Sequence, residues 1–222
     1  MDRSEQMSID REKLMARAAV LALITIAYNI VEGVVSVIFG MQDDTLSLFG
    51  FGLDSFVEVI SGMGIWHMVR RMRRKPEDAP DRYEQRALKI TGSAFYVLSA
   101  GLGVTALLNL VQGHHPETTI WGVFVGAISI LTMGFLIHFK KNVGTDLGSD
   151  AILADANCTK ACLYLSVALL VASVGYEWTH IGGLDALGAL WIAWYAFIEG
   201  REAFEKSQGK PCSCASCGTP PA

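Results

Sequence analysis

The chain has 222 residues, of which 51% are apolar or aromatic before its 22 glycines are counted, and only 18% are charged. Soluble domains average about 25% charged residues, and about 45–50% apolar residues with glycine included, so this composition predicts a membrane protein and excludes a disordered chain. The net charge of −4 provides no basic field for nucleic acid, so a nucleic-acid-binding protein is excluded as well.

The first 14 residues mix acidic and basic side chains and are predicted to form a cytoplasmic N-terminal segment. The apolar run that follows is longer than the about 7–15 residues of a signal-peptide core, so we expect it to be retained. Lysine and arginine are then absent from three long intervals, 18–69, 90–139 and 161–200. A membrane-spanning helix needs about 20 apolar residues, so each interval has room for two helices and a tight turn. The sequence therefore predicts an all-α polytopic membrane protein, in which residues 15–206 form six transmembrane helices at about 15–39, 45–69, 86–111, 119–139, 150–174 and 183–205.

Positive charge is confined to the segments between the predicted hairpins. Five basic residues lie within 70–75, and Lys140 and Lys141 begin the link 140–149. The turns inside the hairpins contain no lysine or arginine. Because basic loops mark the cytoplasmic side, we expect both termini in the cytoplasm and the protein in the cell inner membrane.

Two acidic residues, Asp54 and Glu58, lie within the second predicted span. Their spacing of four residues places them one turn apart on one helix face. An ionisable side chain near the bilayer centre is costly, and it indicates a functional site. Either a metal ion binds the two carboxylates, or both acids are protonated and form hydrogen bonds between helices.

The fifth predicted span contains a second pair at the same spacing, Cys158 and Cys162. At about 1.5 Å of rise per residue, counted from opposite membrane faces, this pair and the acidic pair both reach the middle of the bilayer. If the two helices touch, two carboxylates and two thiols form the four-ligand set of a tetrahedral divalent metal. Alternatively, the two cysteines are simply small apolar residues of the helix interface.

With these two pairs in register, the sequence resembles the cation diffusion facilitator family of proton-coupled metal transporters. Asp54 and Glu58 match the pair that the family places on its second span. Cys158 and Cys162 align with its pair on the fifth span, which is usually His and Asp. The resemblance covers about residues 14–206 and implies a homodimer. Because only residues 207–222 follow, it also implies an atypical member without the family's cytoplasmic C-terminal domain.

The donor atoms indicate which ion is bound. Thiolates favour soft or borderline ions, whereas carboxylates alone suit Mg²⁺, Ca²⁺ or Mn²⁺. Two sulfur and two oxygen ligands therefore predict Zn²⁺ or Cd²⁺, carried as a substrate and with no cofactor. Four ionised ligands carry a charge of −4, so we expect one or two to keep protons while the metal displaces the others. This competition predicts antiport by alternating access, with protons moving inward and metal outward.

Three further polar residues are candidates for an accessory metal site or a proton path. Asn29 and Glu32 share a face of the first span, where Glu32 either supports the ligands or forms a hydrogen bond that packs two helices. Asp155 lies one turn before Cys158, where it either lines the entry or is solvated at the start of the helix.

The last 16 residues, 207–222, are predicted to be a flexible tail. Three cysteines, Cys212, Cys214 and Cys217, stand within six residues of it, flanked by proline and glycine. Such a segment suits the capture of soft metal ions, so the tail either collects metal for the pore or is a redox-responsive or merely tolerated end.

The predicted function is thus export of Zn²⁺ or Cd²⁺ in exchange for protons, by a protein that is not an enzyme. One alternative is a metal sensor or accessory subunit that binds metal without transporting it. The other is a membrane thiol oxidoreductase, although Cys158 and Cys162 lack the C-x-x-C spacing typical of redox dithiols.

Overall fold

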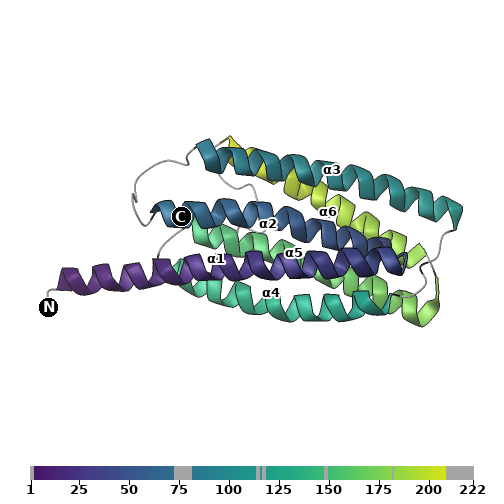
Figure 1. The fold of residues 1–222 in the computed structure, drawn as a ribbon, viewed down its shortest axis with the longest axis horizontal. Helices are drawn as coiled ribbons and strands as arrows, with labels where there is room; N and C mark the ends of the chain where they lie inside the picture. The colour runs from purple at the N-terminus through teal and green to yellow at the C-terminus, as the bar shows by residue number, and fades with distance from the viewer. Residues whose placement is uncertain are drawn as a thin grey trace, which may run out of the picture.

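The structure, a computed structural model, describes residues 3–72, 82–113, 116, 119–147, 150–181 and 183–208. These residues form six α-helices and, within the described ranges, no β-strand (Figure 1). The all-α prediction is therefore confirmed. The helices are α1 (Arg3–Gln42), α2 (Leu46–Met72), α3 (Arg82–Gln112), α4 (Ile120–Leu147), α5 (Asp150–Thr179) and α6 (Gly183–Ser207).

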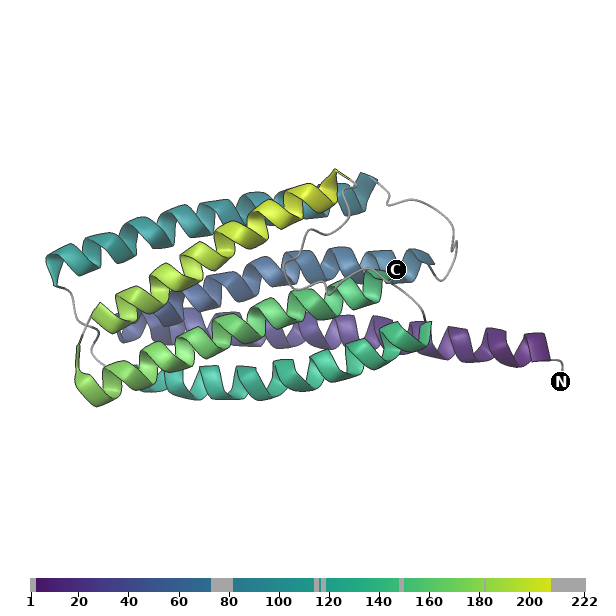
Figure 2. The same ribbon diagram turned by 180° about the vertical axis from the view of Figure 1, so that it is seen from behind.

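The helices run along one long axis and pack as three close pairs. α1 packs along α2, α4 along α5, and α3 along α6. Figures 1 and 2 show the α3–α6 pair at one edge of the bundle and the other four helices beside it. α2 lies centrally, since it contacts α1 and α3 extensively and α4, α5 and α6 as well. Side chains in the middle of α2 are therefore enclosed by several other helices.

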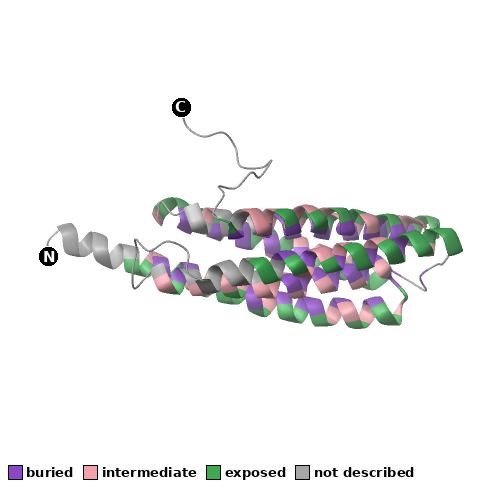
Figure 3. Cartoon of the chain, turned by 90° about the horizontal axis from the view of Figure 1, so that it is seen from above, coloured by how far each residue is buried: buried purple, intermediate pink, exposed green. Residues whose placement is uncertain are grey.

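The outer surface of the bundle is apolar. Five segments are long and apolar enough to cross a membrane: 12–42, 46–71, 92–112, 120–147 and 159–179. α6 falls outside this group because charged residues and tryptophans lower its hydropathy, yet its Trp191, Trp194 and Phe197 are exposed as on the other helices. The exposed faces run along the length of the bundle (Figure 3). A surface of this kind is stable in lipid, so the chain is a polytopic membrane protein.

Of the helices that extend beyond their predicted bounds, α1 and α4 extend furthest. α1 begins at Arg3, so helix continues through most of the predicted N-terminal segment, and α4 continues to Leu147 through most of the predicted link 140–149. The prediction that the fourth span ends at 139 is therefore wrong for the helix. The reason is packing, because buried positions of α4 recur every three or four residues from Gly122 to Gly144.

Glycines bring paired helices into backbone contact. A β-carbon on Gly40 of α1 would lie 2.7 Å from the Cα of Phe49 on α2. A β-carbon on Gly52 of α2 would lie 2.8 Å from the backbone nitrogen of Val37 on α1. Either added methyl group would force the helices apart, so glycine permits the α1–α2 approach.

Carboxylates from other helices fix the beginnings of α2 and α4. The buried Asp185 of α6 accepts hydrogen bonds from the backbone nitrogens of Leu46 (2.8 Å) and Ser47 (3.1 Å), and from the Ser47 hydroxyl. Glu177 of α5 similarly accepts the backbone N–H of Thr119 at 2.6 Å. The first N–H groups of a helix have no partner within it, so these carboxylates act as N-caps supplied from a distance. Asp185 thereby fixes the position of the helix that carries Asp54 and Glu58.

Candidate metal site

Glu58 is the meeting point of three helices. Its Oε1 accepts a hydrogen bond from the Sγ–H of Cys162 on α5, and its Oε2 accepts one from Nδ2 of Asn29 on α1 at 2.9 Å. α2 and α5 therefore touch where the sequence places one member of each predicted ligand pair. An oxygen donor and a sulfur donor share this point in the interior of the bundle.

Asp54 lies one turn from Glu58 on α2 and is 2% exposed. Its Oδ1 is buried and accepts no hydrogen bond. The charged groups that act on it are Glu58, Glu199 and Glu32, all of them acidic. A buried carboxylate oxygen without a donor, among other carboxylates, is suited to a cation.

Glu32 is held by hydrogen bonds within the α1–α2 pair. Its Oε1 accepts the hydroxyl of Tyr28 at 2.8 Å, and its Oε2 accepts the hydroxyl of Ser55 at 3.2 Å. Of the two alternatives for this residue, the structure shows the hydrogen bond that packs two helices. Both oxygens are occupied, which distinguishes Glu32 from Asp54.

Several predicted site residues are not placed by the structure. The backbone of Cys158 and Asp155 belongs to α5, but the structure does not describe the side chains of these two residues. The tail cysteines, Cys212, Cys214 and Cys217, lie outside the described residues, and the last two have C-x-x-C spacing. Among the side chains that are described, no three of His, Cys, Asp and Glu lie close enough to hold a metal ion. The four-ligand set remains a prediction.

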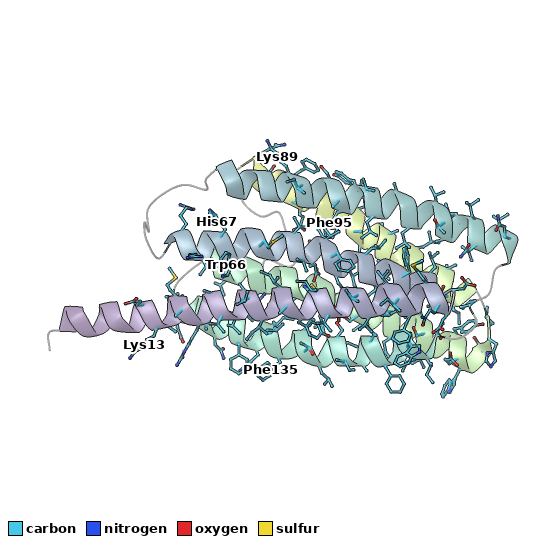
Figure 4. All side chains as sticks on the ribbon, viewed as in Figure 1. Lys13, Trp66, His67, Lys89, Phe95 and Phe135 are labelled. Carbon is cyan, nitrogen blue, oxygen red and sulfur yellow. The ribbon has the colours of Figure 1, made fainter. Side chains whose placement is uncertain are left out.

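Histidine, the commonest transition-metal ligand, does not complete the site in the described ranges. His67 lies near the end of α2 (Figure 4), nine residues or about 13 Å beyond Glu58 along the helix. His138 of α4 contacts Asn142 at 3.1 Å and lies on the exposed face. The donors that surround Glu58 are therefore oxygen and sulfur.

Lys140 is a site residue that the sequence analysis missed. It is 1% exposed, although the sequence predicts it in a cytoplasmic link. Its Nζ donates a hydrogen bond of 2.9 Å to Oγ1 of Thr159, the residue that follows Cys158 on α5. Its charge also acts on Glu58. The sequence pattern could have predicted this burial, because Lys140 falls on the repeat of buried positions that recurs every three or four residues in α4.

Comparison with known proteins relates this bundle to transporters. The family model described as the cation efflux transmembrane domain matches residues 18–208. The manganese efflux system protein MneP of Bacillus subtilis is 24% identical over 212 residues, which is 90% of this chain and 70% of the relative. An uncharacterized transporter of Methanocaldococcus jannaschii is 25% identical over 176 residues, 77% of this chain and 62% of the relative. The match includes most of α1, all of α2 to α6, and the buried acids of α2.

Proposed function

The chain belongs to the cation efflux family, and we propose that it exports a divalent transition-metal cation, Zn²⁺ or Cd²⁺, in exchange for protons. The observation that carries this proposal is the contact between Glu58 on α2 and Cys162 on α5. It joins an oxygen donor and a sulfur donor within the membrane-spanning bundle. The proposed ligands are Asp54, Glu58, Cys158 and Cys162.

The sulfur donors decide the proposed ion. Thiolate binds borderline and soft ions such as Zn²⁺ and Cd²⁺ in preference to Mn²⁺, which prefers oxygen. The relative from Bacillus subtilis is named as a manganese efflux protein, which makes Mn²⁺ the competing ion for this site. Measurement of all three ions is therefore part of the test.

The hydrogen bond between Cys162 and Glu58 supports proton coupling. In this bond the Cys162 S–H group is the donor and a Glu58 oxygen is the acceptor, so the thiol carries a proton. A metal ion binds thiolate, so its arrival must release that proton, and its departure must restore it. Metal and proton compete for the same atoms, as antiport requires. Lys140 offsets part of the negative charge that remains.

The remaining features of the proposal concern the surroundings of the site. We place the chain in the inner membrane, with both termini in the cytoplasm, and as a homodimer. Asp155 lines the cytoplasmic entry, and Glu32 supports α1 and α2 around the ligands. The cysteines of the tail collect metal for the pore.

The test is metal flux into proteoliposomes that contain the purified full chain. With a proton gradient imposed, we expect uptake of Zn²⁺ and Cd²⁺ that is faster than uptake of Mn²⁺. Asp54→Ala and Cys158→Ser should abolish it. The matched control is Thr105→Ala on α3, which removes an exposed hydroxyl that bonds only its own helix at Gly101.

Each other outcome has a defined meaning. Flux that ignores the pH gradient would refute proton coupling. Saturable metal binding with no flux would identify a sensor or accessory subunit instead of an exporter. Metal flux that persists in both Asp54→Ala and Cys158→Ser would refute the proposed set of ligands.

A further inference from the structure

Asn29 of α1 has an oxygen atom with no hydrogen-bond partner in the interior of the bundle. The residue is 1% exposed, and its Oδ1 is buried without a donor. Its Nδ2 donates to Glu58 Oε2 at 2.9 Å, which fixes how the amide is turned. A carboxylate only accepts hydrogen bonds, so the NH₂ group of Asn29 must face Glu58. The carbonyl oxygen therefore takes the other of the two terminal positions of the amide.

The other acidic or amide residue on this face of α1 does not share this property. Glu32, three residues further on, accepts a hydrogen bond at each oxygen, from Tyr28 and from Ser55. Of the two, only Asn29 therefore has a vacant acceptor. The second vacant acceptor near Glu58 is Oδ1 of Asp54. Each such buried oxygen destabilises the fold unless something binds it.

We propose that Oδ1 of Asn29 is a direct ligand of the transported cation, beside Asp54 and Glu58. This inference rests on the proposed metal site and extends it to a third helix. Glu58 connects the two vacant oxygens, because it accepts a hydrogen bond from Asn29 and lies one turn from Asp54, so a cation bound at Glu58 is expected to satisfy both. The Asn29 amide then has two functions, since its nitrogen orients the Glu58 carboxylate and its oxygen joins the coordination shell.

The additional ligand changes which ions fit the site. An amide oxygen raises the number of ligands without adding negative charge to a buried, already acidic cluster. Zn²⁺ is satisfied by four ligands in a tetrahedron, whereas Mn²⁺ prefers oxygen and commonly takes six ligands in an octahedron. Asn29 therefore raises the affinity for the competing ion Mn²⁺ more than the affinity for Zn²⁺, and it narrows the preference for Zn²⁺ that the sulfur donors provide. It is a specificity-determining residue.

The experiment compares Asn29→Ala, Asn29→Asp and the wild type as purified full chains. Calorimetry with MnCl₂ and ZnCl₂ measures affinity, and X-ray absorption at the manganese edge measures the number of light-atom ligands. For Asn29→Ala we expect Mn²⁺ affinity to fall about 100-fold, the upper end of what loss of an outer-shell partner costs, with a much smaller change for Zn²⁺ and one oxygen fewer around Mn²⁺. Asn29→Asp keeps an oxygen and should keep the wild-type ligand number.

The matched control is Ser36→Ala on the same helix. Ser36 is also fully buried with an unpaired oxygen, but it packs against Gly52 two turns away from Asn29. Its removal should leave both affinities unchanged.

Three results would overturn the proposal. One is an unchanged Mn²⁺ shell in Asn29→Ala. Another is an equal loss of Mn²⁺ and Zn²⁺ affinity in that variant. The third is an Asn29→Asp variant that loses the ligand as alanine does, because the amide would then only orient Glu58. Failure of the wild type to bind either metal would refute the metal site itself, which separates the two proposals.

Discussion

Two aspartates of this bundle, Asp54 and Asp185, are buried to nearly the same degree, with 2% and 3% of their surface exposed. Asp185 receives three hydrogen bonds from the first two residues of α2. Asp54 has a buried oxygen that receives none, and the charged groups acting on it are acidic. The protein supplies hydrogen-bond donors to the Asp185 carboxylate, whereas it supplies none to Oδ1 of Asp54.

This contrast assigns Asp185 a structural role and supports the proposal that Asp54 binds the cation. Removal of a charge that the protein fully satisfies exposes unpaired partners and destabilises the fold. Removal of a charge that the protein does not satisfy relieves a cost and should affect only the ligand. Burial alone would not have distinguished the two residues.

The largest expected effect is that of Asp54→Asn on metal binding. Asparagine keeps an oxygen at this position but removes the negative charge of the ligand. Loss of an outer-shell partner alone typically costs 10- to 100-fold, so metal affinity should fall by more than about 100-fold. The thermal unfolding midpoint in detergent should stay the same or rise, because the variant removes one acid from a buried cluster of acids. Calorimetry and thermal unfolding on the same preparation check both parts. A lower midpoint with unchanged affinity would reverse the assignment.

Asp185→Asn should show the opposite pattern with a smaller effect. An amide has one acceptor oxygen where the carboxylate has two, so Leu46 or Ser47 loses its partner at the start of α2. We expect the free energy of unfolding to fall by about 1–3 kcal/mol. Metal affinity of the folded fraction should change less than in Asp54→Asn. If affinity fell as far as in that variant, Asp185 would belong to the binding machinery.

The smallest effect is expected for Glu177→Gln at the start of α4. Glu177 is half-buried and accepts from both the backbone nitrogen and the hydroxyl of Thr119. Glutamine keeps an oxygen that can accept both hydrogen bonds and removes only the negative charge near the start of the helix, so its introduction should cost less than about 1 kcal/mol. Unfolding in denaturant measures the change. A loss larger than that of Asp185→Asn would show that α4, and not α2, limits the stability of the bundle.

The fold was predictable because its main signal is local. Intervals free of lysine and arginine, each long enough for two spans, set the number of helices and most of their ends. The largest exceptions are α1, which begins at Arg3, and α4, which continues past the predicted end and carries Lys140 into the interior. At Lys140 the repeat of buried positions prevails over charge, because Thr159 supplies a hydrogen-bond acceptor. A count of charges cannot reveal that partner.

The site was predictable in part. Spacing within one helix identifies Asp54 with Glu58, and counting residues from opposite faces places Glu58 and Cys162 at one depth, where they are in contact. The contact of Asn29 with Glu58 joins residues 29 positions apart, and that of Asp185 with Leu46 joins residues 139 apart. Such contacts depend on how helices rotate against each other, which a single sequence does not encode in any local pattern.

The glycine contacts between α1 and α2 have a mechanical consequence. Because Gly40 and Gly52 allow the two backbones to touch, we expect these helices to move together, so that Asn29, Asp54 and Glu58 keep their mutual geometry when the bundle rearranges. Cys162 lies on α5, which pairs with α4. A motion of the α1–α2 pair relative to α5 would therefore separate the Cys162 sulfur from the Glu58 oxygen, and the proposed site would lose a sulfur ligand as it opens.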